Sequence, residues 1–262
     1  MMIDFHTHAF PDNIARDAIK ALSQDGKIPS FSDGTLSGLM RSMDASEIDI
    51  SVVLNIATKP SQTRNIIDWC LKIKSDRIIP FASIHPSNSD YEDIIARIKG
   101  EGLKGIKLHP MYQDFEADDE KMFPLYELIS ASGLIVIFHS GKDIAFPDDD
   151  RADVGRILSV REKFRELKMV AAHTGGWRSW KEVYEKLAGK DIYFDISMTS
   201  GYIESAELFH DIIRKHSPDR LLFGTDSPWA DQKKEAAWVD SLDMDREAKD
   251  KIKFKNALEL LS

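Results

Sequence analysis

The chain opens with Ile3-Asp4-Phe5-His6-Thr7-His8, a short apolar run that ends in two histidines. Four further apolar runs also end in a histidine, namely those that reach His85, His109, His139 and His173. Such runs are typical of β-strands, and the carboxyl ends of parallel strands lie on one rim of a barrel. Six imidazoles on one rim offer neutral nitrogen ligands to a transition metal. The pattern therefore predicts a metal site and indicates an enzyme.

The same runs belong to an alternation of strands and helices that extends along the chain. The candidate strands span residues 3–6, 51–56, 78–84, 105–109, 134–139, 169–173, 192–196 and 221–224. The candidate helices span residues 63–74, 91–99, 121–132, 154–167, 180–187, 206–215, 235–242 and 246–260. Eight repeats imply right-handed crossovers, and 262 residues suit one barrel. We expect an α/β fold, a (β/α)8 TIM barrel, in a single domain from 1 to 262.

An open, doubly wound sheet uses the same alternation and is the competing fold. It would place a glycine-rich phosphate loop after its first strand, where this chain has His6-Thr7-His8-Ala9. The missing fingerprint favours the barrel. The segment 9–36, which contains Pro11, Gly26, Pro29 and Gly34, is a candidate lid over the barrel mouth.

The composition limits the classes of partner. The formal net charge is -9, and no cluster of lysines and arginines opposes it, so nucleic acid and anionic membranes are not expected partners. One cysteine, Cys70, excludes an internal disulfide and suits a reducing compartment. No apolar stretch approaches the roughly 18 residues of a membrane span. We expect a soluble, cytoplasmic protein with a small-molecule substrate, and a homodimer remains an open alternative to a monomer.

The His-x-His pair at the end of the first strand is the strongest single motif. Side chains two apart on a strand point to the same face, so His6 and His8 can enter the barrel mouth together, and Asp4 is expected on that face as well. A pair of surface histidines is the bland alternative. Asp226 follows the last strand in Phe223-Gly224-Thr225-Asp226, and barrel closure brings that strand beside the first. Asp226 is therefore either a metal ligand or a turn and cap residue.

Taken together, these motifs resemble the amidohydrolase superfamily. The chain is most similar to its amidohydrolase-2 group, on the strength of the His-x-His pair, Gly105-Ile106-Lys107-Leu108-His109-Pro110, His173-Thr174-Gly175-Gly176 and Phe223-Gly224-Thr225-Asp226. The resemblance implies a distorted (β/α)8 barrel with one divalent metal, usually zinc. It further implies metal ligands at His6, His8, His139 and Asp226, and a catalytic role for His173, which is not a lasting ligand in that group.

The residue types agree with hydrolytic chemistry. Zinc lowers the pKa of a bound water to about 7, Asp226 can take the water's proton, and His173 can polarise a carbonyl or act as an acid. We expect hydrolysis of a small lactone, ester or amide, with Asp226 and His173 as the catalytic residues. A metal-dependent decarboxylase acting on a small unsaturated or aromatic acid uses the same ligands and is the alternative. The hydrolase ranks first because the chain is short and lacks identifiable substrate-binding insertions.

Lys107 leaves the number of metals open. In other branches of the superfamily a lysine of the fourth strand is carboxylated and bridges two metals, whereas the Lys-Leu-His-Pro context resembles the group with one. Lys107, His109, Arg178 and Trp229 are weaker candidates for substrate contact. Three other classes remain: phosphoesterases that open with Asp-x-His-x-His, TatD-type deoxyribonucleases, and a barrel in which zinc is purely structural.

Overall fold

The computed structural model describes residues 1–262, apart from the side chain of Asp25. Eight parallel strands alternate with helices, which confirms the α/β barrel. The strands are β1 (Ile3–Thr7), β2 (Ile50–Leu54), β3 (Ile78–Phe81), β4 (Gly105–Leu108), β5 (Ile135–Phe138), β6 (Lys168–Ala171), β7 (Tyr193–Asp195) and β8 (Leu221–Leu222). Most end before the predicted boundary, so His109, His139 and His173 lie in the loops that follow β4, β5 and β6. Histidines in these loops lie where barrel active sites form.

The strands form two arcs that meet at two seams. One sheet has the order β1-β2-β3 and the other the order β4-β5-β6-β7-β8. At the first seam the Lys107 amide donates to the Ala82 carbonyl (2.9 Å). At the second, the Phe5 amide donates to the Phe223 carbonyl (2.8 Å). These hydrogen bonds join the two sheets at both edges. The strands pair over only a short length at each seam, and this is where the barrel is distorted.

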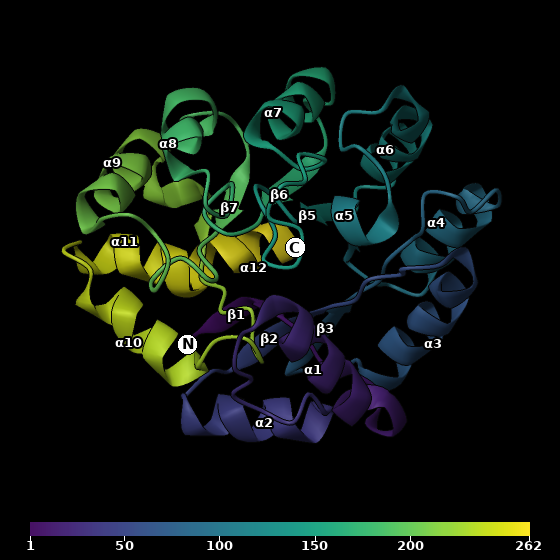
Figure 1. Cartoon of the computed structure of the whole chain (residues 1–262), viewed down its shortest axis with the longest axis horizontal. Helices are drawn as coiled ribbons and strands as arrows, with labels where there is room; N and C mark the ends of the chain where they lie inside the picture. Colours follow the sequence, from purple (N-terminus) through teal and green to yellow (C-terminus); the bar gives the residue numbers. More distant parts are fainter.

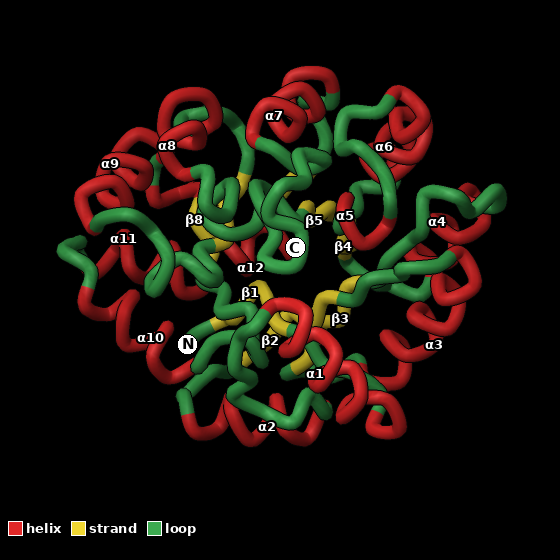
Figure 2. The backbone as a smooth tube through the Cα atoms, in the orientation of Figure 1, coloured by secondary structure: helices red, strands yellow, loops and turns green.

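Helices surround the strands on the outside (Figures 1 and 2). Their apolar faces cover the outer side of the sheet in one continuous cluster that includes Ile94, Ile98, Ile157 and Val160. The α-helices after β2 are α3 (Thr63–Ile73), α4 (Tyr91–Gly100), α5 (Pro110–Gln113), α6 (Phe123–Ala131), α7 (Val154–Lys163), α8 (Trp180–Glu182), α9 (Ala206–His216), α10 (Gln232–Ser241), α11 (Arg246–Asp250) and α12 (Asn256–Leu261). Short 3-10 or π turns are η1 (Pro60–Gln62), η2 (Glu120–Met122), η3 (Val183–Leu187), η4 (Pro218–Arg220) and η5 (Lys251–Lys255).

Two helices between β1 and β2 were not predicted. They are α1 (Asp12–Gly26) and α2 (Leu36–Ala45), in and after the segment interpreted as a lid. The Thr35 side chain caps α2 by accepting from the Gly38 amide. In contrast, α1 follows Pro11, which offers no side-chain cap. Its apolar residues Ile14, Ala18, Ile19 and Leu22 recur at helical spacing, a signal that the sequence analysis did not use.

The barrel interior holds a second apolar cluster. Side chains of the strands fill it, and helix α12 packs against them; its members include Ile3, Phe5, Val52, Leu54, Ile135, Ile137, Val170, Leu222, Ala257 and Leu260. No residue of α12 lines the cavity described below, as far as the described residues show. The interior is therefore a packed core that α12 closes at one end of the barrel, and the cavity with its polar groups lies at the opposite end. Within the described part of the chain, no helix is long and apolar enough to cross a membrane.

Candidate metal centre

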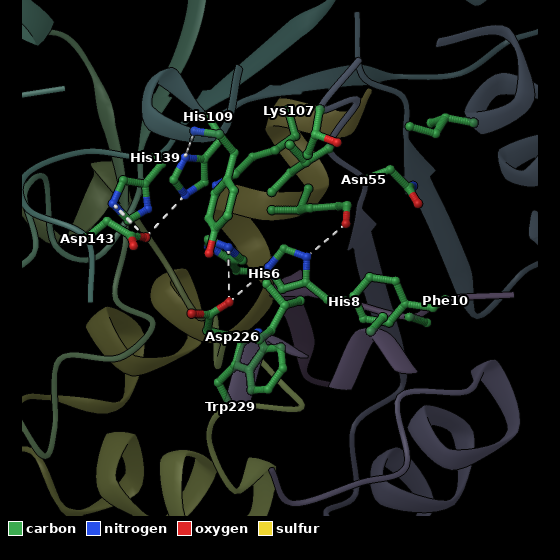
Figure 3. Close-up of a pocket in the computed structure, with 18 of the residues that line it drawn as sticks. His6, His8, Phe10, Asn55, Lys107, His109, His139, Asp143, Asp226 and Trp229 are labelled. Atoms are coloured by element: carbon green, nitrogen blue, oxygen red, sulfur yellow. Dashed lines mark hydrogen bonds and ion pairs between the residues drawn. The ribbon is translucent and has the colours of Figure 1, made fainter. Parts of the chain in front are cut away.

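The structure brings His6, His8 and Asp226 together (Figure 3). The Nε2 atom of His8 lies 3.0 Å from Asp226 Oδ1, and the Nε2 atom of His6 lies 3.4 Å from the same oxygen. The main chain fixes this arrangement, since the Asp226 amide donates to the His6 carbonyl (2.7 Å). Barrel closure thus places a carboxylate 220 positions away against the His-x-His motif, as the sequence predicts.

Each of these two histidines is held by its other ring nitrogen. His6 Nδ1–H donates to Asp195 Oδ2 (3.0 Å), and His8 Nδ1–H donates to the Leu54 carbonyl (2.9 Å). An outer acceptor of this kind sets the tautomer and leaves the second nitrogen as a lone pair. Both Nε2 lone pairs therefore point toward Asp226. A carboxylate oxygen and two imidazole lone pairs in contact are donors that suit a divalent transition metal.

His173 and His139 occupy the adjoining wall. Ligand atoms of His6, His173 and Asp226 all lie within 4.8 Å of one another. His139 is not part of this group but contacts it through His173, because its Nδ1 atom lies 3.2 Å from His173 Nε2. The structure thus places His173 closer to the core of the group than His139. The assignment of His139 as a lasting ligand and of His173 as a catalytic group stays a prediction.

A second cluster lies on the far side of His139. Ligand atoms of His109, His139 and Asp143 also fall within 4.8 Å of one another, and all three residues are buried. The rings of His109 and His139 are stacked, with centroids 4.2 Å apart. The sequence analysis did not identify Asp143. Its only local signal is a position four residues after His139 in the loop that follows β5.

The electrostatics of the site favour neutral imidazoles beside one cation. Burial lowers the pKa of His6 and of His173 well below the ordinary histidine value. Burial alone would raise the pKa of Asp226, but His6, His8 and Lys107 outweigh it and hold that pKa below its usual value. Burial lowers the pKa of Lys107 to about 8, although Asp195, Asp226 and Asp143 oppose the shift. Lys107 Nζ is buried and has no hydrogen-bond partner among the described residues.

These groups open onto one cavity of about 500 Å³. Lys107, His109 and Trp229, three of the weaker candidates for substrate contact, line it. The fourth, Arg178, lies outside this lining, where its guanidinium stacks over Trp177 (4.5 Å to the ring centroid). Most of the remaining wall is apolar and includes Phe10, Ile14, Leu22, Ile28, Leu54, Ile56, Ile66, Trp69, Ile144, Trp177 and Met198. Side chains of α1, among them Ile14, Ala18 and Leu22, supply part of it, and the interpretation of segment 9–36 as a lid stays a prediction.

Asp4 does not share the face of His6, contrary to the expectation from strand alternation. Its carboxylate accepts from the Thr225 hydroxyl (2.6 Å) and from Gln232 Nε2 (2.7 Å), away from the cavity. The register of β1 against β2 shifts between Asp4 and Thr7, which breaks the two-residue period. Burial raises the pKa of Asp4 to about 7. Asp4 thus ties β1 to the segment after β8, on the side of the candidate metal centre that faces away from the cavity.

Asp195 and Ser197 are also parts of the site that the sequence analysis missed. Asp195 is fully buried at the end of β7 and orients His6, as described above. Ser197 Oγ lies 2.9 Å from His173 Nδ1. Neither residue belongs to a recognisable local motif. Only the tertiary contacts identify them.

Comparison with known proteins agrees with this geometry. The family model described as amidohydrolase matches residues 3–262. The chain belongs to the amidohydrolase family. This confirms the resemblance inferred from the histidine motifs and makes the chain a member of an enzyme superfamily. A comparison with curated proteins finds no match for this amidohydrolase.

Solved structures share its fold along the whole length. An uncharacterized TIM-barrel protein from Bordetella bronchiseptica is 22% identical, with a TM-score of 0.78 and coverage of 99% of this chain and 98% of the other. The 5-carboxyvanillate decarboxylase of Sphingomonas paucimobilis is 14% identical, with a TM-score of 0.73 and the same coverage. A dihydroxybenzoic acid decarboxylase from Polaromonas sp. JS666, solved with bound manganese, is 16% identical, with a TM-score of 0.75 and coverage of 99% and 96%. At these identities the likeness supports the fold.

Proposed function

We propose that this amidohydrolase is a metal-dependent hydrolase of a small lactone, ester or amide. The observation that carries the proposal is the convergence of His6 Nε2 and His8 Nε2 on Asp226 Oδ1 in the wall of the cavity. We propose His6, His8, His139 and Asp226 as the residues that hold one divalent ion, with zinc as the ion because nitrogen-rich four-ligand sites suit it. A bound ion of this kind acidifies water and polarises a carbonyl group.

Asp226 is the proposed general base. One of its carboxylate oxygens faces the two histidines, which leaves the other free to accept the proton of an attacking water. His173 is the proposed acid: its buried, neutral imidazole lies beside Asp226, receives the water proton from that carboxylate and then donates it to the oxygen or nitrogen of the leaving group. The Lys107 ammonium stabilises negative charge that develops on the substrate carbonyl oxygen. The apolar wall excludes competing water from the bound substrate.

Decarboxylation is the second candidate, and a separate observation favours it. Trp69, Trp177 and Trp229 line the cavity together with Phe10, and this aromatic wall suits the ring of an aromatic acid. Two structures of similar fold come from decarboxylases of aromatic acids. In that reaction Asp226 or His173 would deliver a proton to carbon after loss of carbon dioxide. Both candidates require the same metal residues.

One experiment tests the metal centre and separates the two reactions. Metal content per chain is measured by mass spectrometry on untagged protein, and the zinc and manganese forms are screened against lactones, esters, amides and aromatic carboxylic acids in water labelled with oxygen-18. Label in an acid product together with about one metal per chain supports the hydrolase. Release of carbon dioxide supports the decarboxylase instead. About two metals per chain would instead support a carboxylated Lys107 that bridges two metals. Protein without bound metal would overturn both candidates.

A further inference from the structure

The hydrogen bonds of His139 fix its tautomer. Its Nε2 atom lies 3.0 Å from the Lys142 carbonyl and 3.7 Å from Asp143 Oδ2. Both of these oxygens can only accept, so Nε2 carries the ring proton. The Nδ1 lone pair of His139 is therefore the atom that faces His173 and the metal centre. This is the tautomer that His139 needs in order to act as a ligand through Nδ1.

His109 presents its proton to the same carboxylate. Its Nδ1 atom accepts from the Tyr112 amide at the start of α5 (3.5 Å), so Nε2 carries the proton. That Nε2 atom lies 3.3 Å from Asp143 Oδ2. The other oxygen of Asp143 accepts from the Ala145 amide (2.8 Å), which pins the carboxylate in the loop after β5. Asp143 is thus a fixed acceptor for His109, and its charge also lies beside the protonated Nε2 atom of His139, as Figure 3 shows.

A second metal ion does not fit this cluster. The rings of His109 and His139 are stacked within 18° of parallel, and the Nε2 atom of each faces Asp143 Oδ2, so the space between them is taken by the carboxylate. The hydrogen-bond partners also leave both Nε2 atoms protonated, and a metal ligand must offer a lone pair. The arrangement is that of a hydrogen-bonded support.

We propose that Asp143 is a positioning residue of the metal centre, which orients His139 as a ligand and ties it to His109 on the cavity wall. The inference rests on the proposed function, because it assumes a metal held in part by His139. Loss of an outer-sphere carboxylate of this kind typically weakens metal binding about 10- to 100-fold. Asp143 touches neither the metal nor the reacting atoms in this role. It acts through the ring orientation of His139.

The test compares D143N with D149N. Asp149 lies in the same loop, but its carboxylate accepts from the backbone and side chain of Arg151, away from the cluster. For both variants, zinc affinity is measured by competition with a chelator, and the cobalt-substituted proteins are compared by visible absorption. We expect D143N to bind zinc about 10- to 100-fold more weakly and to change the cobalt spectrum, because Oδ1 accepts from the Ala145 amide and Oδ2 faces two protonated Nε2 atoms, so an asparagine NH2 group at either place meets a donor. D149N should match the wild type in both.

Wild-type affinity and an unchanged cobalt spectrum in D143N would overturn the inference. If the wild type binds no metal, the proposed function fails by itself, and nitrogen-15 NMR of the metal-free protein still tests Asp143. In that measurement the protons of His109 and His139 sit on Nε2 in the wild type, and D143N should disturb this distribution. If D143N does not fold, D143E keeps the charge but moves it by one methylene. It should then show an intermediate zinc affinity, and full wild-type affinity would contradict the role.

Discussion

Replacing Lys107 with Met should make the metal-free protein more stable at neutral pH. Lys107 Nζ is fully buried without a hydrogen-bond partner, and burial lowers its pKa from 10.5 to about 8. At pH 7 this difference between folded and unfolded chains corresponds to about 3 kcal/mol of unfolding free energy that the charged amine removes. Met keeps the volume without the charge. We expect K107M to gain up to about 3 kcal/mol, or roughly 6 °C in Tm.

The pH dependence gives this prediction its sign. Because the folded pKa lies below the unfolded one, the unfolded wild type binds more protons between pH 8 and 10.5 and its stability rises with pH in that window. K107M lacks this titrating amine, so the difference in unfolding free energy between K107M and the wild type should shrink as the pH approaches 10. Urea unfolding in the presence of a chelator, at pH 7 and at pH 10, measures both gaps. The exposed Lys104 supplies the control, since K104M should match the wild type at either pH.

The reasoning is refuted if K107M is no more stable than the wild type at pH 7, or if its advantage is the same at both pH values. The first result would mean that attraction between the ammonium and the three nearby carboxylates outweighs the cost of burying its charge. In either case the metal-loaded K107M enzyme should lose turnover, because Lys107 is the only lysine or arginine among the described residues that line the cavity.

Three further predictions follow from single residues. Burial lowers the pKa of His216 to about 4, so this residue alone should remove about 2 kcal/mol of unfolding free energy between pH 7 and pH 5, and H216F should lose about that much less than the wild type in urea titrations; equal losses would contradict this. Asp226→Asn should lower the bound metal measured by mass spectrometry and abolish turnover, and near-normal activity would show that the assignment after β8 is wrong. Gly141→Ala should lower Tm more than Gly133→Ala, because an added Cβ at Gly141 meets the Trp177 amide at 2.4 Å whereas Gly133 faces open space; the opposite order in thermal unfolding would refute it.

Local sequence determined the barrel and half of the candidate site. Strand and helix periods depend on residues a few positions apart, so the eight strands could be read along the chain. Closure of a barrel then places its last strand beside its first, which is why His6, His8 and Asp226 could be predicted as neighbours. Seven of the eight strands are shorter than predicted, whereas β1 extends one residue further, to Thr7. Apolar residues continue past the last hydrogen bond between neighbouring strands, and only this backbone pairing decides where a strand ends.

Tertiary structure alone decided the partners of these groups. Asp195 supports His6 across 189 positions, and no local pattern can report such a contact. The shift in β1 that turns Asp4 away from the cavity likewise arises from pairing with a neighbouring strand. Lys107 Nζ has no hydrogen-bond partner among the described residues although Asp143, Asp195 and Asp226 lie near it, an arrangement that only the fold sets. The sequence by itself thus determines which chemical groups reach the rim, whereas folding in three dimensions determines which atom of each group stays free to react.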